Sequence, residues 1–149
     1  MLRTQTIANT ILMLSFEEGI PVTPMKLQKL VYCVYKRALQ ETDEKLFSEP
    51  FEAWKYGPVL PSIYYEFSSF QSSAINKFAR SANGEVEIVD LSFSSPAANA
   101  INYIWNKYKN FSGVELSRFT HMSDTAWTKA VNNSSHILED SDIKNEQEF

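Results

Sequence analysis

The chain has 149 residues, of which 44% are hydrophobic and 21% are charged, and its formal net charge is −4. This length and balance are typical of one globular domain with a buried core. The charge is uneven, +1 over residues 1–80 and −5 over residues 81–149, so the second half repels phosphate and disfavours extended nucleic-acid binding.

Cys33 is the only cysteine, so no disulfide can form within the chain. Its place in an apolar helical run predicts a buried, unreactive thiol and fits a reducing compartment. The first residues lack the pattern of an export signal, and no window approaches the roughly 18 apolar residues of a membrane span. We therefore expect a cytoplasmic protein without a membrane segment.

Two helices are predicted at the start of the chain. Ile7, Ile11 and Leu14 recur at helical spacing over residues 4–18, and Gly19 is a suitable stop. Thr23 and Pro24 read as an N-cap and first helical residue of a second helix that runs to about residue 40. Its apolar face consists of Leu27, Leu30, Val31, Val34 and Ala38. The short link between the helices implies an antiparallel or steeply crossed pair.

The middle of the chain combines a dense aromatic stretch with a third helix. Residues 51–61 contain three aromatics, one glycine and two prolines. Residues 51–55 are predicted as a short strand, Gly57-Pro58 as a bend, and residues 61–70 as a helix. Alternating apolar residues at 85–90, after a turn at Asn83-Gly84, predict another strand. It is expected to pair with residues 51–55 or with residues just before Asn83.

The second half of the chain is predicted to be helical. Ser95-Pro96 opens a helix over residues 96–110, a further helix covers residues 114–122, and Ser123-Asp124 caps a short one containing Trp127. The acidic tail, about residues 139–149, either docks as a short helix or frays. The predicted fold is a single mainly helical (α+β) domain over residues 1–149, with about six helices and a β element of two or three strands near the middle.

The sequence contains no recognisable catalytic or metal site. His121 and Asp124 are three residues apart and adjoin Thr120, but no nucleophile and base are organised around them. The simpler interpretation is that Thr120 and His121 cap or cross-link a helix junction. Two histidines and one cysteine show no zinc spacing, and phosphate and calcium loops are missing. We expect no enzyme activity, cofactor or metal.

The basic residues of the second helix have two interpretations. These residues are Lys26, Lys29, Lys36 and Arg37, and they lie mostly off the apolar face. The simpler interpretation makes them the solvated side of an amphipathic helix. The alternative makes them a basic face for nucleic acid or for an acidic partner.

Three aromatic residues also have two interpretations. Trp54, Tyr56 and Trp127 are expected to pack in the core. Tryptophan and tyrosine each carry a polar tip, however, and they are enriched at partly exposed protein interfaces. A binding role for these three residues therefore stays open.

Three segments, in order along the chain, carry a family resemblance. Residues 23–32 contain Lys26-Leu27-Gln28-Lys29-Leu30 and Tyr32, residues 51–59 contain Trp54 and Tyr56-Gly57-Pro58-Val59, and residues 116–130 contain Thr120-His121 and Trp127. Together they resemble the Panacea domain family, which includes SocA-like antitoxins and phage-associated GepA-type proteins. One departure is Ala126, because the family usually has a proline directly before the tryptophan.

The resemblance implies an antitoxin that neutralises a cognate toxin by direct protein–protein contact. Many members of the family lie in prophages. One alternative is a proteolytic adaptor that delivers a toxin to an ATP-dependent protease, and a less favoured one is a nucleic-acid-binding regulator of its own operon. The motif residues are then structural or partner-binding, and the oligomeric state stays open.

Overall fold

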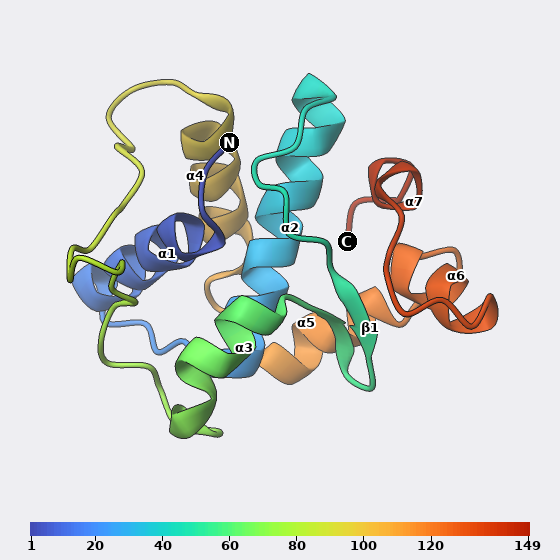
Figure 1. Ribbon diagram of the computed structural model, residues 1–149, viewed down its shortest axis with the longest axis horizontal. Coiled ribbons are helices and arrows are strands. Elements are labelled where there is room, and N and C mark those ends of the chain that lie inside the picture. The colour runs from blue at the N-terminus through green and yellow to red at the C-terminus, as the bar shows by residue number, and fades with distance from the viewer.

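The computed structural model describes residues 1–149 as seven α-helices, one 3₁₀ turn and a two-stranded antiparallel sheet (Figure 1). The helices are α1 (Thr4–Glu18), α2 (Pro24–Thr42), α3 (Pro61–Phe67), α4 (Pro96–Tyr108), α5 (Gly113–Thr120), α6 (Ala126–Asn132) and α7 (Asp140–Lys144), with the 3₁₀ turn η1 (Ser68–Phe70) after α3. The mainly helical class with a small β element is confirmed. No helix is both long enough and apolar enough to cross a membrane.

Helix α2 forms the centre of the molecule (Figure 1). The Thr23 side chain accepts a hydrogen bond from the Lys26 N–H, and Pro24 starts the helix, as the sequence predicts. Helices α1, α3, α4, α5 and α7 and strand β2 all contact α2. Most sides of this helix are therefore covered, which has direct consequences for its lysines.

The sheet pairs β1 (Glu52–Trp54) with β2 (Gly57–Val59), and Ala53 lies opposite Pro58. On the edge of β1 that faces away from β2, Glu52 forms an isolated bridge with Ile137, and the Ala53 N–H donates to the His136 carbonyl at 2.8 Å. The hairpin is thus flanked by the segment between α6 and α7. The strand predicted at residues 51–55 is confirmed in its centre.

The strand predicted at residues 85–90 is wrong. This segment runs along α1, and α1 side chains bind its backbone in place of another strand. The Val89 N–H donates to the Thr10 hydroxyl at 2.8 Å, and the Asn9 amide donates to the Glu87 carbonyl at 3.2 Å. Alternating apolar residues fit an extended segment, but they do not show whether a strand or side chains will bind its backbone.

Local capping explains several helix ends. Gly19 ends α1 in the left-handed conformation, φ 66°, as expected. Ser112 and Glu115 form a reciprocal capping box at the start of α5. The cap of α6 is Thr125, whose hydroxyl accepts from the Thr128 N–H at 3.2 Å, so the prediction of Ser123-Asp124 as its cap is wrong.

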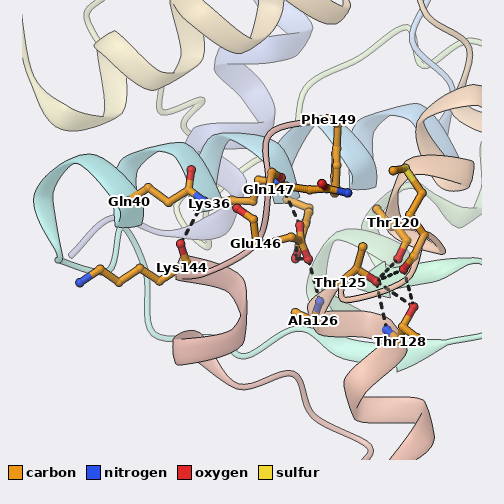
Figure 2. A network of polar contacts seen from close by, with 12 residues as sticks. Lys36, Gln40, Thr120, Thr125, Ala126, Thr128, Lys144, Glu146, Gln147 and Phe149 are labelled. Carbon is orange, nitrogen blue, oxygen red and sulfur yellow. Dashed lines mark hydrogen bonds and ion pairs between the residues drawn. The ribbon is translucent and has the colours of Figure 1, made fainter.

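A single cluster of 33 buried hydrophobic residues forms the core. Tyr32, Tyr35, Phe47 and Phe51 build an aromatic group within it, with ring centroids 4.8–5.9 Å apart. Cys33 is buried, as predicted, and burial raises the pKa of its thiol to about 12, which disfavours the reactive thiolate. The acidic tail docks, with α7 and residues 145–149 packed against α2 (Figure 2).

Candidate functional site

The three segments that carry the family resemblance meet at the β1–β2 hairpin. Four side chains from α2, α5 and α6 donate hydrogen bonds to the carbonyl oxygens of residues 54, 56, 58 and 60, and a ring nitrogen of His121 lies within hydrogen-bond distance of the carbonyl oxygen of residue 55. The pairs are Trp127 with Trp54 at 2.7 Å, His121 with Lys55 at 3.0 Å, Ser117 with Tyr56 at 2.6 Å, Lys29 with Pro58 at 2.9 Å and Gln28 with Leu60 at 3.0 Å. The hairpin is therefore fixed by side chains along nearly its whole length.

Gly57 is the point of closest approach between these segments. Its φ of 116° is unfavourable for a residue with a side chain. A Cβ atom there would lie 2.6 Å from the Thr120 hydroxyl oxygen and 3.1 Å from Lys29 Cε. Only glycine fits both the positive φ and the packing. The predicted bend at Gly57-Pro58 is wrong, however, because the turn lies at Lys55-Tyr56 and both residues belong to β2.

His121 and Thr120 form a cross-link between α5 and the hairpin. The two ring nitrogens of His121 lie 2.7 Å from the Ser117 carbonyl and 3.0 Å from the Lys55 carbonyl, and its ring packs on Trp127. The Thr120 hydroxyl is buried and donates to the Ser117 carbonyl at 2.7 Å. These contacts support the structural interpretation of the pair, since the hydroxyl proton already has an acceptor other than the imidazole.

The interpretation of the α2 lysines as a solvated face is wrong. Lys26, Lys29 and Lys36 are 5%, 1% and 5% exposed. Lys26 donates to the Lys109 carbonyl, and Lys36 pairs with Glu146 at 2.9 Å. Since α2 is surrounded by other elements, its polar positions are buried too, and each lysine has an oxygen partner. The same burial removes the basic face that nucleic-acid binding would need.

Burial also changes the pKa of the Lys29 side chain. Desolvation lowers the pKa of its ammonium from 10.5 to about 7, and the pKa of Lys26 is lowered for the same reason. The Lys29 amine donates to the Pro58 carbonyl and packs against Gly57. No cluster of three or more His, Cys, Asp or Glu side chains could hold a metal ion.

A groove of about 380 Å³ lies beside the hairpin, and we call it the hairpin groove. It is lined by the start of α2, the hairpin, α3 and Gln71. Trp54 packs against Tyr64 with ring centroids 4.9 Å apart, and Tyr56 is 56% exposed. The expected core packing is therefore wrong for Trp54, which is half-buried, and for Tyr56. Trp127 is half-buried and packs against the core.

Gln71 stands out at the rim of the hairpin groove. Its φ of 54° and ψ of −116° lie outside the left-handed helical region that non-glycine residues tolerate. Such angles cost roughly 1–3 kcal/mol and cluster at ligand-binding sites. This feature, like the role of Ser117, carries no signal in the sequence, because both depend on segments that are distant in the chain.

The remaining motif residues stabilise this arrangement from beneath. Leu27, Leu30 and Tyr32 are fully buried in the core, and Val59 is 7% exposed in β2. Ala126, where the family usually has proline, uses its N–H to donate to the Glu146 carboxylate at 2.7 Å. A proline has no N–H, so this contact depends on the departure from the family pattern.

Comparison with known proteins identifies the family of the chain. The family described as "Antitoxin SocA-like, Panacea domain" matches residues 27–128, which hold all three motif segments except their outermost residues. The Antitoxin SocA of Caulobacter vibrioides (strain NA1000 / CB15N) is 38% identical over 65 residues, covering 44% of this chain and 35% of that protein. No solved structure matches the chain. With a match over more than half of its length, the chain belongs to the family of SocA-like antitoxins with a Panacea domain.

Proposed function

We propose that this chain is an antitoxin that neutralises a cognate toxin by direct contact, and that the hairpin groove is the contact surface. The observation that carries the proposal is an aromatic group at the hairpin groove, made of the half-buried Trp54 and the exposed Tyr56 on the hairpin and the exposed Tyr64 on α3. Side-chain hydrogen bonds to its backbone hold the hairpin in place. Family membership supports the antitoxin role.

Rigidity and composition both suit the hairpin groove for protein binding. Tyrosine and tryptophan supply large contact areas at protein interfaces. A hairpin that is already ordered loses little conformational entropy when a partner binds. The groove volume of about 380 Å³ accommodates one or two protruding apolar side chains of a toxin. Neutralisation is then steric, because the bound antitoxin covers the toxin's active site or substrate entry.

Co-expression with the product of the adjacent gene tests the antitoxin role. We expect the wild-type chain to relieve that gene's toxicity and to co-purify with its product. A folded chain that does neither contradicts the proposed function as a whole. If relief comes with a shortened half-life of the toxin, the protein acts as a proteolytic adaptor and not as a steric inhibitor.

Two exposed tyrosines test the surface separately from the role. Tyr56→Ala and Tyr64→Ala should each reduce the amount of toxin that co-purifies with the chain at least 10-fold. Both variants should keep a melting temperature within a few degrees of wild type. Phe93→Ala is the matched control, because Phe93 is 71% exposed on the segment before α4 and lies outside the hairpin groove. Unchanged toxin binding by both tyrosine variants would show that the toxin binds another face of the molecule.

A further inference from the structure

Residues 145–149, which we call the strap, run across the second half of α2 (Figure 2). Glu146 is the only buried residue of the strap, at 4% exposed. Its carboxylate accepts from the Tyr32 hydroxyl at 2.9 Å, the Lys36 amine at 2.9 Å and the Ala126 N–H at 2.7 Å. The strap therefore covers a specific site for one carboxylate. We call the surface beneath the strap, which includes Tyr32, Lys36 and Ala126, the strap groove.

Three further hydrogen bonds bind the strap through its backbone carbonyls. Lys36 donates to the Gln147 carbonyl at 2.7 Å, Gln40 to the Glu146 carbonyl at 2.8 Å and Tyr108 to the Phe149 carbonyl at 2.8 Å. Such contacts fit any extended segment, since every residue has a carbonyl oxygen. The groove thus selects by side chain mainly at Glu146 and at Phe149.

The position of Phe149 is as specific as that of Glu146. Its ring lies 3.4 Å from the Lys36 amine and stacks on Phe119, with ring centroids 5.7 Å apart. A glutamate followed three residues later by an aromatic residue satisfies both subsites. Between them, Glu148 pairs with Lys107 at 2.7 Å, so the groove also favours a second acid.

Three of the five strap residues, Asn145, Gln147 and Glu148, are exposed. Phe149 packs against the 33-residue core cluster without belonging to it. Without the strap, the Lys36 amine and the Tyr32 hydroxyl lose their shared carboxylate acceptor. Another carboxylate that enters the site would restore these hydrogen bonds.

We propose that this groove is an exchangeable peptide site, in which the strap is the resident occupant. The replacing ligand is an extended segment of a partner protein that has a glutamate and, three residues later, an aromatic residue. Charge supports this choice, since Lys36 and Lys107 both face the groove and both bind acids of the strap. All donors to the strap lie within residues 27–128, the family-matched part of the chain, whereas the strap lies beyond it.

The test uses the full chain with Glu146→Gln and Phe149→Ala, which weaken the strap. A fluorescein-labelled hexapeptide that copies residues 144–149 and is blocked at both ends should bind this variant at least 10-fold tighter than wild type. In the wild-type chain the strap competes as a tethered ligand. A peptide with glutamine in place of Glu146 should bind the variant at least 10-fold more weakly. Equal binding of both peptides, or no binding by the folded variant, overturns the proposal.

Ala126→Pro, added to the weakened-strap variant, provides a matched variant that removes one donor. Proline suits this first position of α6, because Thr125 already has the extended angles φ −81° and ψ 158°. Peptide affinity should fall at least threefold while the melting temperature stays within a few degrees. An unchanged affinity would mean that the carboxylate does not enter the site.

Hydrogen exchange of the wild-type chain keeps the proposal testable if the weakened-strap variant does not fold. The Ala126 amide is expected to exchange at least 10-fold faster than the Lys129 amide of the same helix, because strap release exposes only the former. Exchange of both amides only through global unfolding makes the strap part of the permanent core and overturns the proposal. A wild-type dimer with exchanged straps assigns the groove to a second copy and overturns it as well.

Discussion

Gly57 links the three motif segments at the scale of a single residue. It adopts φ 116°, and a Cβ atom added there would come closer than van der Waals contact to Thr120 and Lys29. Gly84 provides a natural comparison, because it also has a positive φ, of 84°, but has open space around it. Alanine substitutions at Gly57 and Gly84 therefore separate the free-energy cost of the backbone conformation from the free-energy cost of the close approach.

Gly57→Ala should destabilise the protein by at least about 3 kcal/mol, as backbone strain and overpacking add. Gly84→Ala should cost only the strain, about 1–2 kcal/mol. Urea unfolding followed by circular dichroism measures both free energies. Equal losses for the two variants would show that Thr120 and Lys29 move aside, and that Gly57 is needed only for its positive φ.

Lys29 makes stability depend on pH in an unusual direction. Its pKa is about 7 in the folded protein and 10.5 in the unfolded chain, so between these values the unfolded chain holds one more proton. The free energy of unfolding therefore rises with pH over this range and falls as pH drops to 7. Above pH 9 the opposite effect of Cys33 begins, because burial raises the pKa of its thiol from 9.0 to about 12.

Between pH 7 and pH 9 the Lys29 contribution should raise the free energy of unfolding by about 2 kcal/mol. Urea unfolding at several pH values measures it. Lys29→Met should remove most of this rise, while Lys55→Met, at an exposed position, should keep it. A wild-type chain whose stability is constant across this window would mean that Lys29 stays charged when folded.

Elements of this fold are often joined by a side chain that replaces a missing backbone partner. Asn9 of α1 takes this role for the long segment between η1 and α4. It donates to the Ala79 carbonyl at 2.9 Å and accepts from the Ala79 N–H at 2.8 Å, as a neighbouring strand would. Asn9 is 1% exposed, so removing its amide leaves buried groups unpaired.

Asn9→Ala should cost about 2–4 kcal/mol and loosen residues 71–95 selectively. Limited proteolysis should then cut within this segment before the helices are attacked. Asn106→Ala, at an exposed position on α4, should change stability by less than about 0.5 kcal/mol. A cleavage pattern that matches wild type would mean that the contacts of Arg3 and Thr10 are sufficient to hold the segment.

For the whole molecule, the aromatic residues around β1 divide between core and surface. Phe51 is 2% exposed among Tyr32, Tyr35 and Phe47, whereas Trp54, three residues later, lies at the hairpin groove. The half-buried Trp54 packs on Tyr64 and donates to Glu52 at 2.8 Å. Phe51 should therefore matter for folding, and Trp54 mainly for binding.

Phe51→Ala should cost about 3–5 kcal/mol, as expected for a buried aromatic residue. Trp54→Ala should cost about 1–2 kcal/mol, the sum of one aromatic pair and one hydrogen bond. Thermal and urea unfolding of both variants checks the order. A larger loss for Trp54→Ala would restore the core assignment that its sequence context favours.

The sequence was sufficient where local signals decide the structure. Helical spacing and caps gave α1, α2 and α4 to within about two residues, because Gly19, Thr23 and Ser95 act on their own neighbours. The burial of Lys29 could not be predicted this way, since it depends on the elements that surround α2. Nor could the partner of Lys36, because Glu146 lies 110 residues away in the chain.

The candidate site was predictable in its members but not in its arrangement. The motif residues around Trp54, Gly57 and His121 do lie together, and the resemblance had already grouped them. Periodicity gives no information on which aromatic side chains of a short hairpin face solvent. The exposure of Tyr56 and the strained backbone of Gln71 therefore emerge only from the packed molecule.

The hairpin has a further consequence, which concerns how binding partners can change during evolution. One edge is occupied at the Ala53 N–H by His136, and at the other edge Pro58 has no N–H while Gln28 binds both polar groups of Leu60. A partner therefore cannot extend this sheet by adding a strand, a mode of binding that tolerates many sequences. If a toxin binds at the hairpin groove as proposed, its recognition there depends on side chains alone, and a substitution at an exposed position such as Tyr56 would alter partner choice without disturbing the fold.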